Sequence, residues 1–551
     1  MLLEVKDLHT HLEAGGETVR AVDGVSFGIK PGETFCLVGE SGSGKSVTAL
    51  SVIQLLPRDI SRHPGGQILF RARDVQGHSE VVDMLQLDEA RRRQIRGMRM
   101  SMIFQEPMTS LNPVFSVGDQ IVEVLKLHQS HLSDAEARER AVEALAQVQI
   151  PNPAERANEF PHRLSGGQRQ RVMIAMAMAC EPDLLIADEP TTALDVTVQA
   201  EILRLMRELQ ERNGMSILFI THDFGVVAQM GHRLGVMRLG KLVEEGTVRQ
   251  VLDHPEHPYT RQLIDALPEN LTRRREAAGE GGRPAPVGEP LVRLDDLQIH
   301  FPVRKGLMRR VVDHVRAVDG VSLAIPRGQV LALVGESGCG KTTLGRAILR
   351  LVEPTGGQIH FAGDDITRLP RARLQPYRRR MQIIFQDPMS SLNPRLTVAA
   401  MLTEPMAVHG IGIDKEDRLV RAAQVLEQVQ LPADTLWRYP HEFSGGQRQR
   451  IGIARALVLD PAFIVCDEVT SALDVSVQAQ ILEILMALTR ERGLTLLFIT
   501  HNIGVVEYLA DTMAVMYQGR VVEYGPARQI CHQPQHEYTR KLLAAVPRLS
   551  P

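Results

Sequence analysis

Short apolar runs recur along the chain, and each ends at glycines, at acidic residues or at a Thr-His pair. Thr34–Val38 and Val330–Val334 are each followed by a glycine-rich loop and helix-forming sequence, which predicts the order strand, loop, helix. The other runs cover residues 184–187, 463–466, 217–220 and 496–499. Since strands buried on both faces read as continuous apolar runs, we predict an α/β fold with a mainly parallel sheet in each half of the chain.

The order of the motifs repeats, which predicts a tandem duplication. Residues 19–26 return as residues 315–322, at an offset of 296 (315 − 19). The later motifs, from Ser165 and Ser444 onward, keep an offset of 279 (444 − 165). The first copy therefore carries extra sequence around residues 71–93, which we interpret as a surface elaboration.

Residues 268–290 separate the two copies and are poor in apolar residues but rich in glycine, proline and charge. Such a segment cannot bury enough surface to order itself. We therefore predict a first domain over 1–268, a flexible linker over 269–290 and a second domain over 291–551.

Each glycine-rich loop has the spacing of a phosphate-binding loop that ends in a lysine and a hydroxyl residue. The glycines let the backbone curl, so that N–H groups and the helix N-terminus face the α- and β-phosphates of a nucleotide. The lysine would reach the β- and γ-phosphate oxygens, and the hydroxyl residue would hold Mg²⁺. The expected nucleotide contacts are Gly39, Ser41, Gly42, Gly44, Lys45, Ser46 and Val47 in the first loop, and Gly335, Ser337, Gly338, Gly340, Lys341, Thr342 and Thr343 in the second.

An acidic pair follows one apolar run in each half, where the strand ends of a parallel sheet face a ligand. The first acids, Asp188 and Asp467, are placed to hold Mg²⁺ together with Ser46 or Thr342. The second acids, Glu189 and Glu468, are placed to orient or deprotonate the water that attacks the γ-phosphate. An Asp-Glu pair can also cap a helix, but a neighbouring phosphate loop favours the catalytic interpretation.

In each half a histidine follows the end of a further predicted strand, at His222 and His501. There it could hydrogen-bond the γ-phosphate and hold the water and the glutamate in line. A single histidine would be weak evidence, but this one repeats at the offset of 279 (501 − 222).

Two long helical stretches open with a Ser-Gly-Gly-Gln turn. A hydroxyl, bare N–H groups and the positive end of a helix dipole make such a turn a second anion site. Each domain already has a phosphate loop, so this turn is expected to receive a phosphate held elsewhere. The residues are Ser165, Gly166, Gly167 and Gln168 in the first copy, and Ser444, Gly445, Gly446 and Gln447 in the second.

Composition agrees with a large protein that acts on phosphate. The chain has 551 residues, enough for two or more domains, and its formal net charge of −3 gives no general attraction to nucleic acid or anionic lipid. We interpret the short basic runs at 91–93 and 378–380 as solvated helix faces rather than nucleic-acid contacts. Its five cysteines have no paired spacing, which suggests a reducing compartment and argues against a metal held by cysteine. No apolar run approaches the ~18 residues of a membrane span, so the chain is expected only to dock on membrane proteins.

These motifs resemble those of the ATP-binding-cassette (ABC) transporter ATPases, and the resemblance covers both halves nearly end to end. It implies two tandem P-loop domains, each with a mainly parallel core, an antiparallel β subdomain and a helical subdomain. It also implies an intramolecular dimer in which two ATP molecules lie head to tail, each between one phosphate loop and the other domain's Ser-Gly-Gly turn. Site one would join Lys45, Ser46, Gln105, Asp188, Glu189 and His222 to Ser444, Gly445, Gly446 and Gln447. Site two would join Lys341, Thr342, Gln386, Asp467, Glu468 and His501 to Ser165, Gly166, Gly167 and Gln168.

Two further pairs of residues match motifs of this family. Asp195 and Asp474 match its loop that crosses between the domains. Gln105 and Gln386 match the residues that contact Mg²⁺, sense the γ-phosphate and lead into the helical subdomain touching the membrane partner. The resemblance therefore implies that hydrolysis is gated by closure of one domain on the other.

Other motifs are similar to the ATPases of bacterial dipeptide, oligopeptide and glutathione importers. They cover 108–113 with its repeat 389–394, the tails 257–261 and 536–540, and residues 301–307. This resemblance implies two integral-membrane permease partners and, through them, a periplasmic or lipid-anchored substrate-binding protein. It also implies a peripheral position on the cytoplasmic face of the inner membrane. The cargo would be chosen by those partners.

The sequence departs from the family pattern at three places. Aligning the first strands puts Leu12 opposite Phe301, where the family commonly stacks an aromatic ring on adenine. Val469 replaces the proline found at Pro190, and hydrolysis is expected to survive because Glu468 remains. The four-cysteine cluster of some peptide-importer ATPases is absent, so no iron–sulfur centre is expected.

The main alternative is a soluble tandem cassette that acts on ribosomes or nucleic acid. Such proteins usually join their halves with a long, basic, helical linker, whereas residues 272–289 are short, rich in glycine and proline, and near-balanced in charge. A small-molecule kinase would leave the duplicated Ser-Gly-Gly-Gln turns without a role. We therefore expect an importer ATPase.

Overall fold

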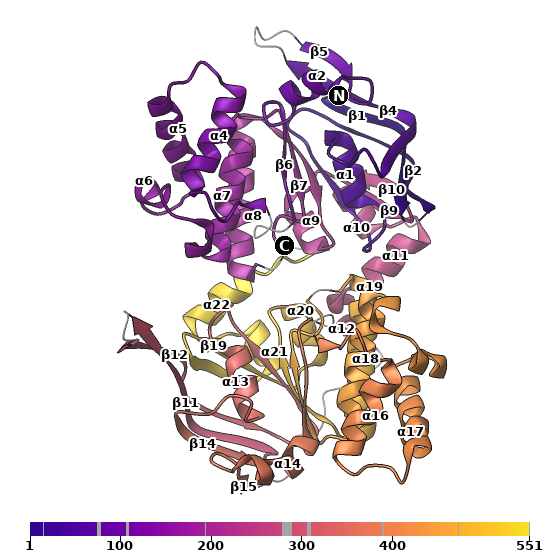
Figure 1. Ribbon diagram of the computed structural model, residues 1–551, viewed down its shortest axis with the longest axis vertical. Coiled ribbons are helices and arrows are strands. Elements are labelled where there is room, and N and C mark those ends of the chain that lie inside the picture. Colours follow the sequence, from indigo (N-terminus) through magenta and orange to yellow (C-terminus); the bar gives the residue numbers. More distant parts are fainter. Residues whose placement is uncertain are drawn as a thin grey trace. The chain divides into compact units, whose positions relative to one another are not determined.

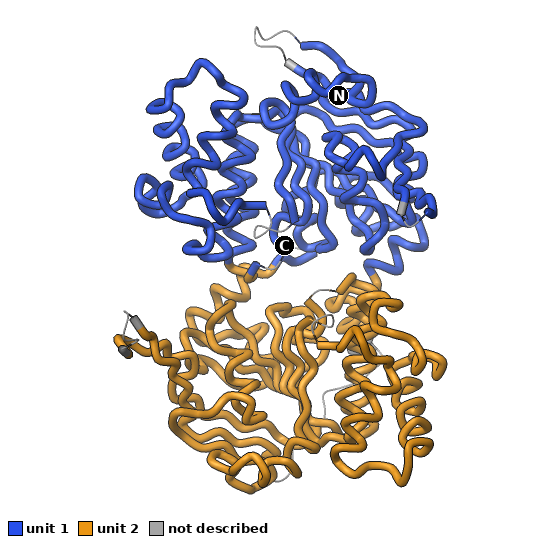
Figure 2. The backbone as a smooth tube through the Cα atoms, viewed as in Figure 1, with its two compact units in different colours: residues 1–194, 198–264, 547–551 blue, residues 195–197, 265–546 orange. Residues whose placement is uncertain are grey.

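The chain forms two compact units, which Figure 2 shows in different colours. Residues 1–194, 198–264 and 547–551 make up the first unit, and residues 195–197 and 265–546 make up the second. The structure is a computed structural model. It describes residues 1–14, 16–73, 79–105, 110–192, 194–277, 289–305, 310–387, 391–471 and 473–549. Parts of the importer-type motifs, at 108–109, 306–307 and 389–390, lie outside the described residues.

Each unit contains the mainly parallel sheet that the apolar runs predict (Figure 1). Among the described residues, its strand order in the first unit is β10 (Lys241–Thr247), β9 (Arg233–Arg238), β3 (Thr34–Val38), β8 (Ser216–Ile220), β7 (Leu184–Asp188) and β6 (Met100–Ile103). The second unit repeats it as β20 (Arg520–Pro526), β19 (Thr512–Tyr517), β13 (Val330–Val334), β18 (Thr495–Ile499), β17 (Phe463–Asp467) and β16 (Met381–Ile384). Strands β10 and β20 run antiparallel to their neighbours, and the other pairs are parallel. The predicted α/β fold class is confirmed.

An antiparallel sheet packs beside the parallel one in each unit. In the first unit its order is β2 (Glu17–Ile29), β1 (Leu3–Ala14), β4 (Ser61–Arg73) and β5 (Ser79–Asp83). In the second unit it is β12 (Arg310–Ile325), β11 (Val292–Lys305), β14 (Gly356–Phe361) and β15 (Asp364–Asp365). Phe27 of β2 stacks on Phe35 of β3 with ring centroids 4.9 Å apart, which ties the two sheets into one core. Strands β4 and β5 are longer than β14 and β15, and this accounts for part of the extra sequence in the first copy.

The helices follow the same plan in both units. Helices α1 (Lys45–Ile53) and α13 (Lys341–Ile348) start at the phosphate loops, and α8 (Val196–Asn213), α9 (Phe224–Met230), α19 (Val475–Arg492) and α20 (Ile503–Leu509) follow later strands. A helical subdomain is formed by α4 (Val117–His128), α5 (Asp134–Gln147) and α7 (Gly166–Met178), and in the second unit by α16 (Val398–Val408), α17 (Lys415–Gln428) and α18 (Gly445–Leu457). The tails carry α10 (Val248–Asp253) and α11 (Pro258–Asp265), and α21 (Ala527–His532) and α22 (Glu537–Ala544). In the described part of the chain, none of the helices has the length and apolar character needed to cross a lipid bilayer.

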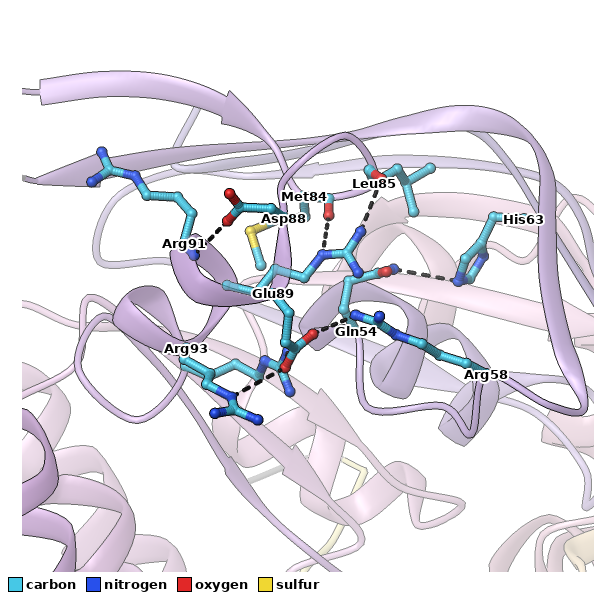
Figure 3. Close-up of polar contacts among 11 residues, drawn as sticks. Gln54, Arg58, His63, Met84, Leu85, Asp88, Glu89, Arg91 and Arg93 are labelled. Atoms are coloured by element: carbon cyan, nitrogen blue, oxygen red, sulfur yellow. Dashed lines mark hydrogen bonds and ion pairs between the residues drawn. The ribbon is translucent and has the colours of Figure 1, made fainter.

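The basic run 91–93 lies on α2 (Glu89–Ile95), and Figure 3 shows its contacts. Arg91 and Arg93 are exposed, as predicted for a solvated face, and they pair with Glu80 and Glu89. Arg92 departs from that prediction, because its half-buried guanidinium donates to the carbonyl oxygens of Met84 (3.1 Å) and Leu85 (2.9 Å). It therefore holds the turn that follows β5 against the helix.

Arg350 makes the corresponding contacts in the second unit. Its guanidinium donates to the carbonyl oxygens of Ile366 and Thr367 after β15, at 3.2 and 2.8 Å. Position 350 corresponds to Gln54 in the first copy (350 − 54 = 296), so Arg92 supplies this guanidinium from another element. The extra sequence of the first copy thus includes a structural replacement for the arginine that the first copy lacks at position 54, the C-cap of α1.

Part of the expected linker is a helix. Residues Pro268–Ala277 form α12, which packs against α20, and Leu271 is buried in the core of the second unit. The expectation of a flexible segment was wrong here, because one buried leucine and a proline at the helix start outweigh the polar composition. The remaining linker residues, 278–288, lie outside the described residues.

Candidate functional site

The two phosphate loops lie between β3 and α1 and between β13 and α13. Gly44 and Gly340, at the N-caps of these helices, have φ angles of +102° and +109°. A Cβ atom at Gly44 would lie 2.3 Å from the carbonyl oxygen of Ala21, and one at Gly340 would lie 2.0 Å from that of Ala317. The last glycine of each loop is therefore required by both backbone conformation and space.

The loop lysines are buried, with exposed fractions of 6% for Lys45 and 5% for Lys341. Lys45 Nζ donates to the carbonyl oxygens of Gly39 (2.7 Å) and Glu40 (2.8 Å). Lys341 Nζ makes the same two bonds at 2.8 Å each, to Gly335 and Glu336. Each loop is thus curled around an ammonium group, which suits the recognition of phosphate oxygens.

A hydroxyl and a carboxylate meet beside each loop. Ser46 Oγ donates to Asp188 Oδ1 at 3.1 Å, and Thr342 Oγ1 donates to Asp467 Oδ1 at 2.9 Å. Burial raises the pKa of Asp188 to about 6 and also raises the pKa of Asp467. Paired hard oxygen donors at a buried carboxylate fit Mg²⁺, so these residues could hold this ion.

The strand order brings the predicted catalytic residues together. Strand β8 lies between β3 and β7, so His222, after β8, falls between the phosphate loop and the acidic pair. Glu189 accepts hydrogen bonds from Gln105 Nε2 at 3.0 Å and Thr192 Oγ1 at 2.9 Å, and its Oε1 lies 3.2 Å from His222 Nδ1. Its φ angle of +47° is rare for a residue with a side chain. The backbone strain and the three contacts fix where this carboxylate points.

The second unit repeats this arrangement with a looser carboxylate. Glu468 has a φ angle of +48° and accepts from Gln386 Nε2 at 2.7 Å, but its Oε1 lies 3.7 Å from His501 Nδ1. Ser471 takes the place of Thr192, and its hydroxyl donates to the backbone oxygen of Glu468 at 2.9 Å. Sequence reasoning missed Thr192, although a hydroxyl residue three positions after the glutamate recurs in the second copy as Ser471 and could have pointed to it.

The electrostatics favour an ionised base at both sites. Burial alone would raise the pKa of Glu189, but the hydrogen bond and charge of His222, with the Thr192 hydroxyl and Lys45, lower it to about 2. The pairing with His501 likewise lowers the pKa of Glu468. Both glutamates are therefore carboxylates at neutral pH, as a group that orients or accepts a proton from water requires.

The Ser-Gly-Gly turns are preformed at the N-termini of α7 and α18. Ser165 Oγ accepts from Gln168 N at 3.3 Å, and Gln168 Oε1 accepts from Ser165 N at 3.1 Å. Ser444 and Gln447 form the same capping box at 3.3 and 3.0 Å. The first glycines, Gly166 and Gly445, are exposed, whereas Gly167 is half-buried and Gly446 is buried. The N–H groups of a helix's first turn have no partner within the helix.

The remaining predicted residues lie in the phosphate loops or at the starts of helices. Asp195 belongs to the second unit, where its carboxylate accepts a hydrogen bond from the N–H of Ser337. Asp474 is the N-cap of α19. Ser41, Gly42 and Gly338 lie in the phosphate loops, and Val47 and Thr343 lie in the first turns of α1 and α13.

The strand registers support the alignment of Leu12 with Phe301. Leu12 pairs with Val19 and Phe301 pairs with Val315, and these valines are equivalent at the offset of 296 (315 − 19). Phe301 is 43% exposed, so its ring is available to stack on a base.

We expect the second cassette to bind ATP more tightly than the first, because stacking on a base contributes ~1–3 kcal/mol. The measurement is ATP affinity with one loop lysine removed at a time. Phe301→Leu should weaken binding at its own site, and Leu12→Phe should strengthen it. Equal affinities at the two sites would contradict the assignment.

Comparisons with known proteins place both halves of the chain in one family. The family model described as ABC transporter matches residues 22–192 and 318–471, and the model described as oligopeptide/dipeptide transporter, C-terminal region, matches 243–290 and 522–551. A peptidoglycan transport ATP-binding protein of Agrobacterium fabrum is 51% identical over 99% of this chain and 96% of its own length. A glutathione import ATP-binding protein of Escherichia coli is 48% identical over all of this chain and 90% of its own length. A solved dimeric ATP-binding cassette with bound ADP and phosphate is 29% identical over 45% of this chain and 99% of its own, with a TM-score of 0.39.

The matched family regions contain both phosphate loops and both acidic pairs, and the matched C-terminal regions contain both tails. The chain therefore belongs to the ABC transporter family as a tandem pair of ATP-binding, ATP-hydrolysing cassettes, each followed by the C-terminal region of oligopeptide and dipeptide transporters.

Proposed function

We propose that the chain energises a bacterial importer of peptides, of the dipeptide, oligopeptide or glutathione class. The observation that carries this proposal is the twofold match to the oligopeptide/dipeptide transporter C-terminal region. A full-length relative named for glutathione import supports the same cargo class. The proposed partners are two membrane permeases and, through them, a substrate-binding protein, with the ATPase on the cytoplasmic face of the inner membrane.

We also propose that each ATP is completed by both cassettes. The phosphate loop, Mg²⁺ ligands, glutamate and histidine of one cassette would act together with the Ser-Gly-Gly turn of the other. The helix N-termini at Ser165 and Ser444 support this, because each would offer a phosphate a second binding place besides the loop of its own cassette. A trapped ATP-bound protein in which each triphosphate contacts one cassette alone would contradict it.

We propose a chemical role for each residue, which its placement supports. Lys45 donates to the phosphate oxygens, and Ser46 with Asp188 would hold Mg²⁺, which neutralises charge on the β- and γ-phosphates when bound. Glu189 orients the attacking water and accepts its proton, while His222 keeps the carboxylate in place. Gln105 bonds to Glu189, so its movement toward the nucleotide would couple the γ-phosphate to the helical subdomain. The equivalent residues act in the second cassette.

The proposal is tested by ATP-dependent uptake into proteoliposomes. The full chain is reconstituted with any pair of permeases found encoded beside its gene, and labelled glutathione, dipeptides and longer peptides are supplied with a substrate-binding protein from the same organism. Uptake of one peptide class is expected, and it should be lost in the Glu189→Gln, Glu468→Gln variant. ATPase activity stimulated by ribosomes or nucleic acid, without uptake, would favour the alternative.

A further inference from the structure

A tyrosine of each C-terminal tail reaches the phosphate loop of the same unit. Tyr259 lies in α11 and Tyr538 lies in α22, and both are buried, at 4% and 9% exposure. The Tyr538 hydroxyl accepts a hydrogen bond from the N–H of Glu336 at 3.1 Å. The Tyr259 hydroxyl accepts from the N–H of Glu40 at 3.4 Å and donates to its Oε2 at 3.1 Å. Both tyrosines thus contact the second residue of the loop, from about 200 positions away in sequence (259 − 40 = 219).

The same loop residue is also held by the loop lysine. Glu40 receives a bond from Lys45 at its carbonyl oxygen, and its N–H faces Tyr259. In the second unit, Lys341 donates to the carbonyl oxygen of Glu336, and the N–H of Glu336 donates to the Tyr538 hydroxyl. The tyrosine contacts the N–H of this residue and the lysine contacts its carbonyl oxygen, so a lysine that turns to a phosphate need not break the tyrosine contact. It can therefore keep the loop backbone in place while the lysine changes partner.

The tails themselves are fastened to the strands beside them. Glu244 of β10 accepts from the N–H groups of Glu256 (2.8 Å) and His257 (3.1 Å), and His257 Nδ1 accepts from Tyr259 N at 3.1 Å. In the second unit Glu523 of β20 accepts from Gln535 N and His536 N at 2.8 and 3.1 Å, and His536 Nδ1 accepts from Tyr538 N at 3.1 Å. The backbone just before each tyrosine is therefore held in place by hydrogen bonds to the neighbouring strand.

The surroundings of the two rings differ, although both hydroxyls accept a hydrogen bond from the N–H of the same loop residue. The guanidinium of Arg238 lies over the Tyr259 ring, 4.7 Å from its centroid. The equivalent position in the second copy is Tyr517, whose ring lies 4.2 Å from that of Tyr538. Two different packing solutions thus deliver a hydroxyl to the same loop residue, which argues that the hydroxyl contact matters beyond filling space.

We propose that Tyr259 and Tyr538 are positioning residues that hold the phosphate loops ready for nucleotide, so that the importer-type C-terminal region sets the ATP affinity of each cassette. This inference deepens the ATPase function proposed above and rests on it. The tyrosines act through the loop backbone and do not touch the reacting atoms. Preorganising the loop lowers the ordering that binding must supply.

The test replaces each tyrosine by phenylalanine in the full chain, which removes one oxygen and keeps the ring. Tyr259→Phe is measured in a Lys341→Ala background and Tyr538→Phe in a Lys45→Ala background. The lysine variant weakens binding at the other site, so the measured affinity is mainly that of the site with the tyrosine change. We expect the Kd for MgATP and MgADP to rise about two- to tenfold, the effect of one hydrogen bond. KM should rise with little change in kcat, and amide hydrogen exchange at Glu40 or Glu336 should become faster.

The matched control is Tyr524→Phe. Its hydroxyl also bonds to a backbone group, the carbonyl oxygen of Ala324 at 3.0 Å, but away from the loop. This control should leave nucleotide affinity unchanged. The inference is overturned if the two tail variants bind nucleotide like their parents, or if they lose affinity only to the extent that Tyr524→Phe does. These readouts do not depend on cargo, so a failed uptake assay would overturn the proposed importer function and leave this inference standing.

Discussion

Replacing both Glu189 and Glu468 by glutamine is expected to slow ATP turnover by about 10² or more, because glutamine cannot accept a proton from water. ATP binding should remain, since the phosphate loops and the Ser46–Asp188 and Thr342–Asp467 pairs are untouched. Turnover is measured as phosphate release, and binding as retained labelled ATP per chain.

The single variants separate the two sites. Glu189 has the additional bond from Thr192 Oγ1 at 2.9 Å, so its amide replacement should be held in place as well. Glu189→Gln with Glu468 intact, and the reverse, report the contribution of each site to turnover. Near-normal turnover in the double variant would mean that neither glutamate acts on the water.

Replacing Lys45 or Lys341 by alanine is expected to weaken ATP binding at its own site by about 10- to 100-fold, the range of hydrogen bonds made by a charged donor. The free energy of unfolding without nucleotide should change little, because Lys45 Nζ bonds to carbonyl oxygens within its own loop. ATP affinity and the nucleotide-free melting temperature are measured on the same protein.

The matched control is Lys241→Ala. This lysine belongs to the first unit, and its side chain, which is 63% exposed, pairs with Asp23. It should leave ATP affinity unchanged. A collapse of the nucleotide-free melting temperature in Lys45→Ala, but not in Lys241→Ala, would show that the loop lysine is needed for folding rather than for phosphate.

The phosphate loops could be identified from sequence because their chemistry is local. A few consecutive residues provide the glycine conformations, the lysine and the hydroxyl, and Thr34–Val38 provides the preceding strand. The same holds for the turn at Ser165, whose capping box spans the four residues 165–168. Duplication strengthened each assignment, since a chance motif has no reason to repeat at a constant offset.

The errors arose where packing outweighs composition. Helix α12 was expected to be part of a flexible linker, yet burial of Leu271 against the second unit orders it. Arg92 was expected on a solvated face, yet two carbonyl oxygens near β5 hold it. Both outcomes depend on surfaces contributed by other parts of the chain, which a local window of sequence does not contain.

By itself, the sequence determined the α/β fold class, the twofold repeat and the residue types of each nucleotide site, because these follow from short-range periodicity and spacing. Only the tertiary structure decided which side chains meet. The strand order brings Gln105 and His222 into contact with Glu189. The packing of the tail brings Tyr259 into contact with Glu40, 219 positions away (259 − 40). Contacts between residues so far apart depend on how the sheets and tails pack, and packing is a property of the whole folded unit.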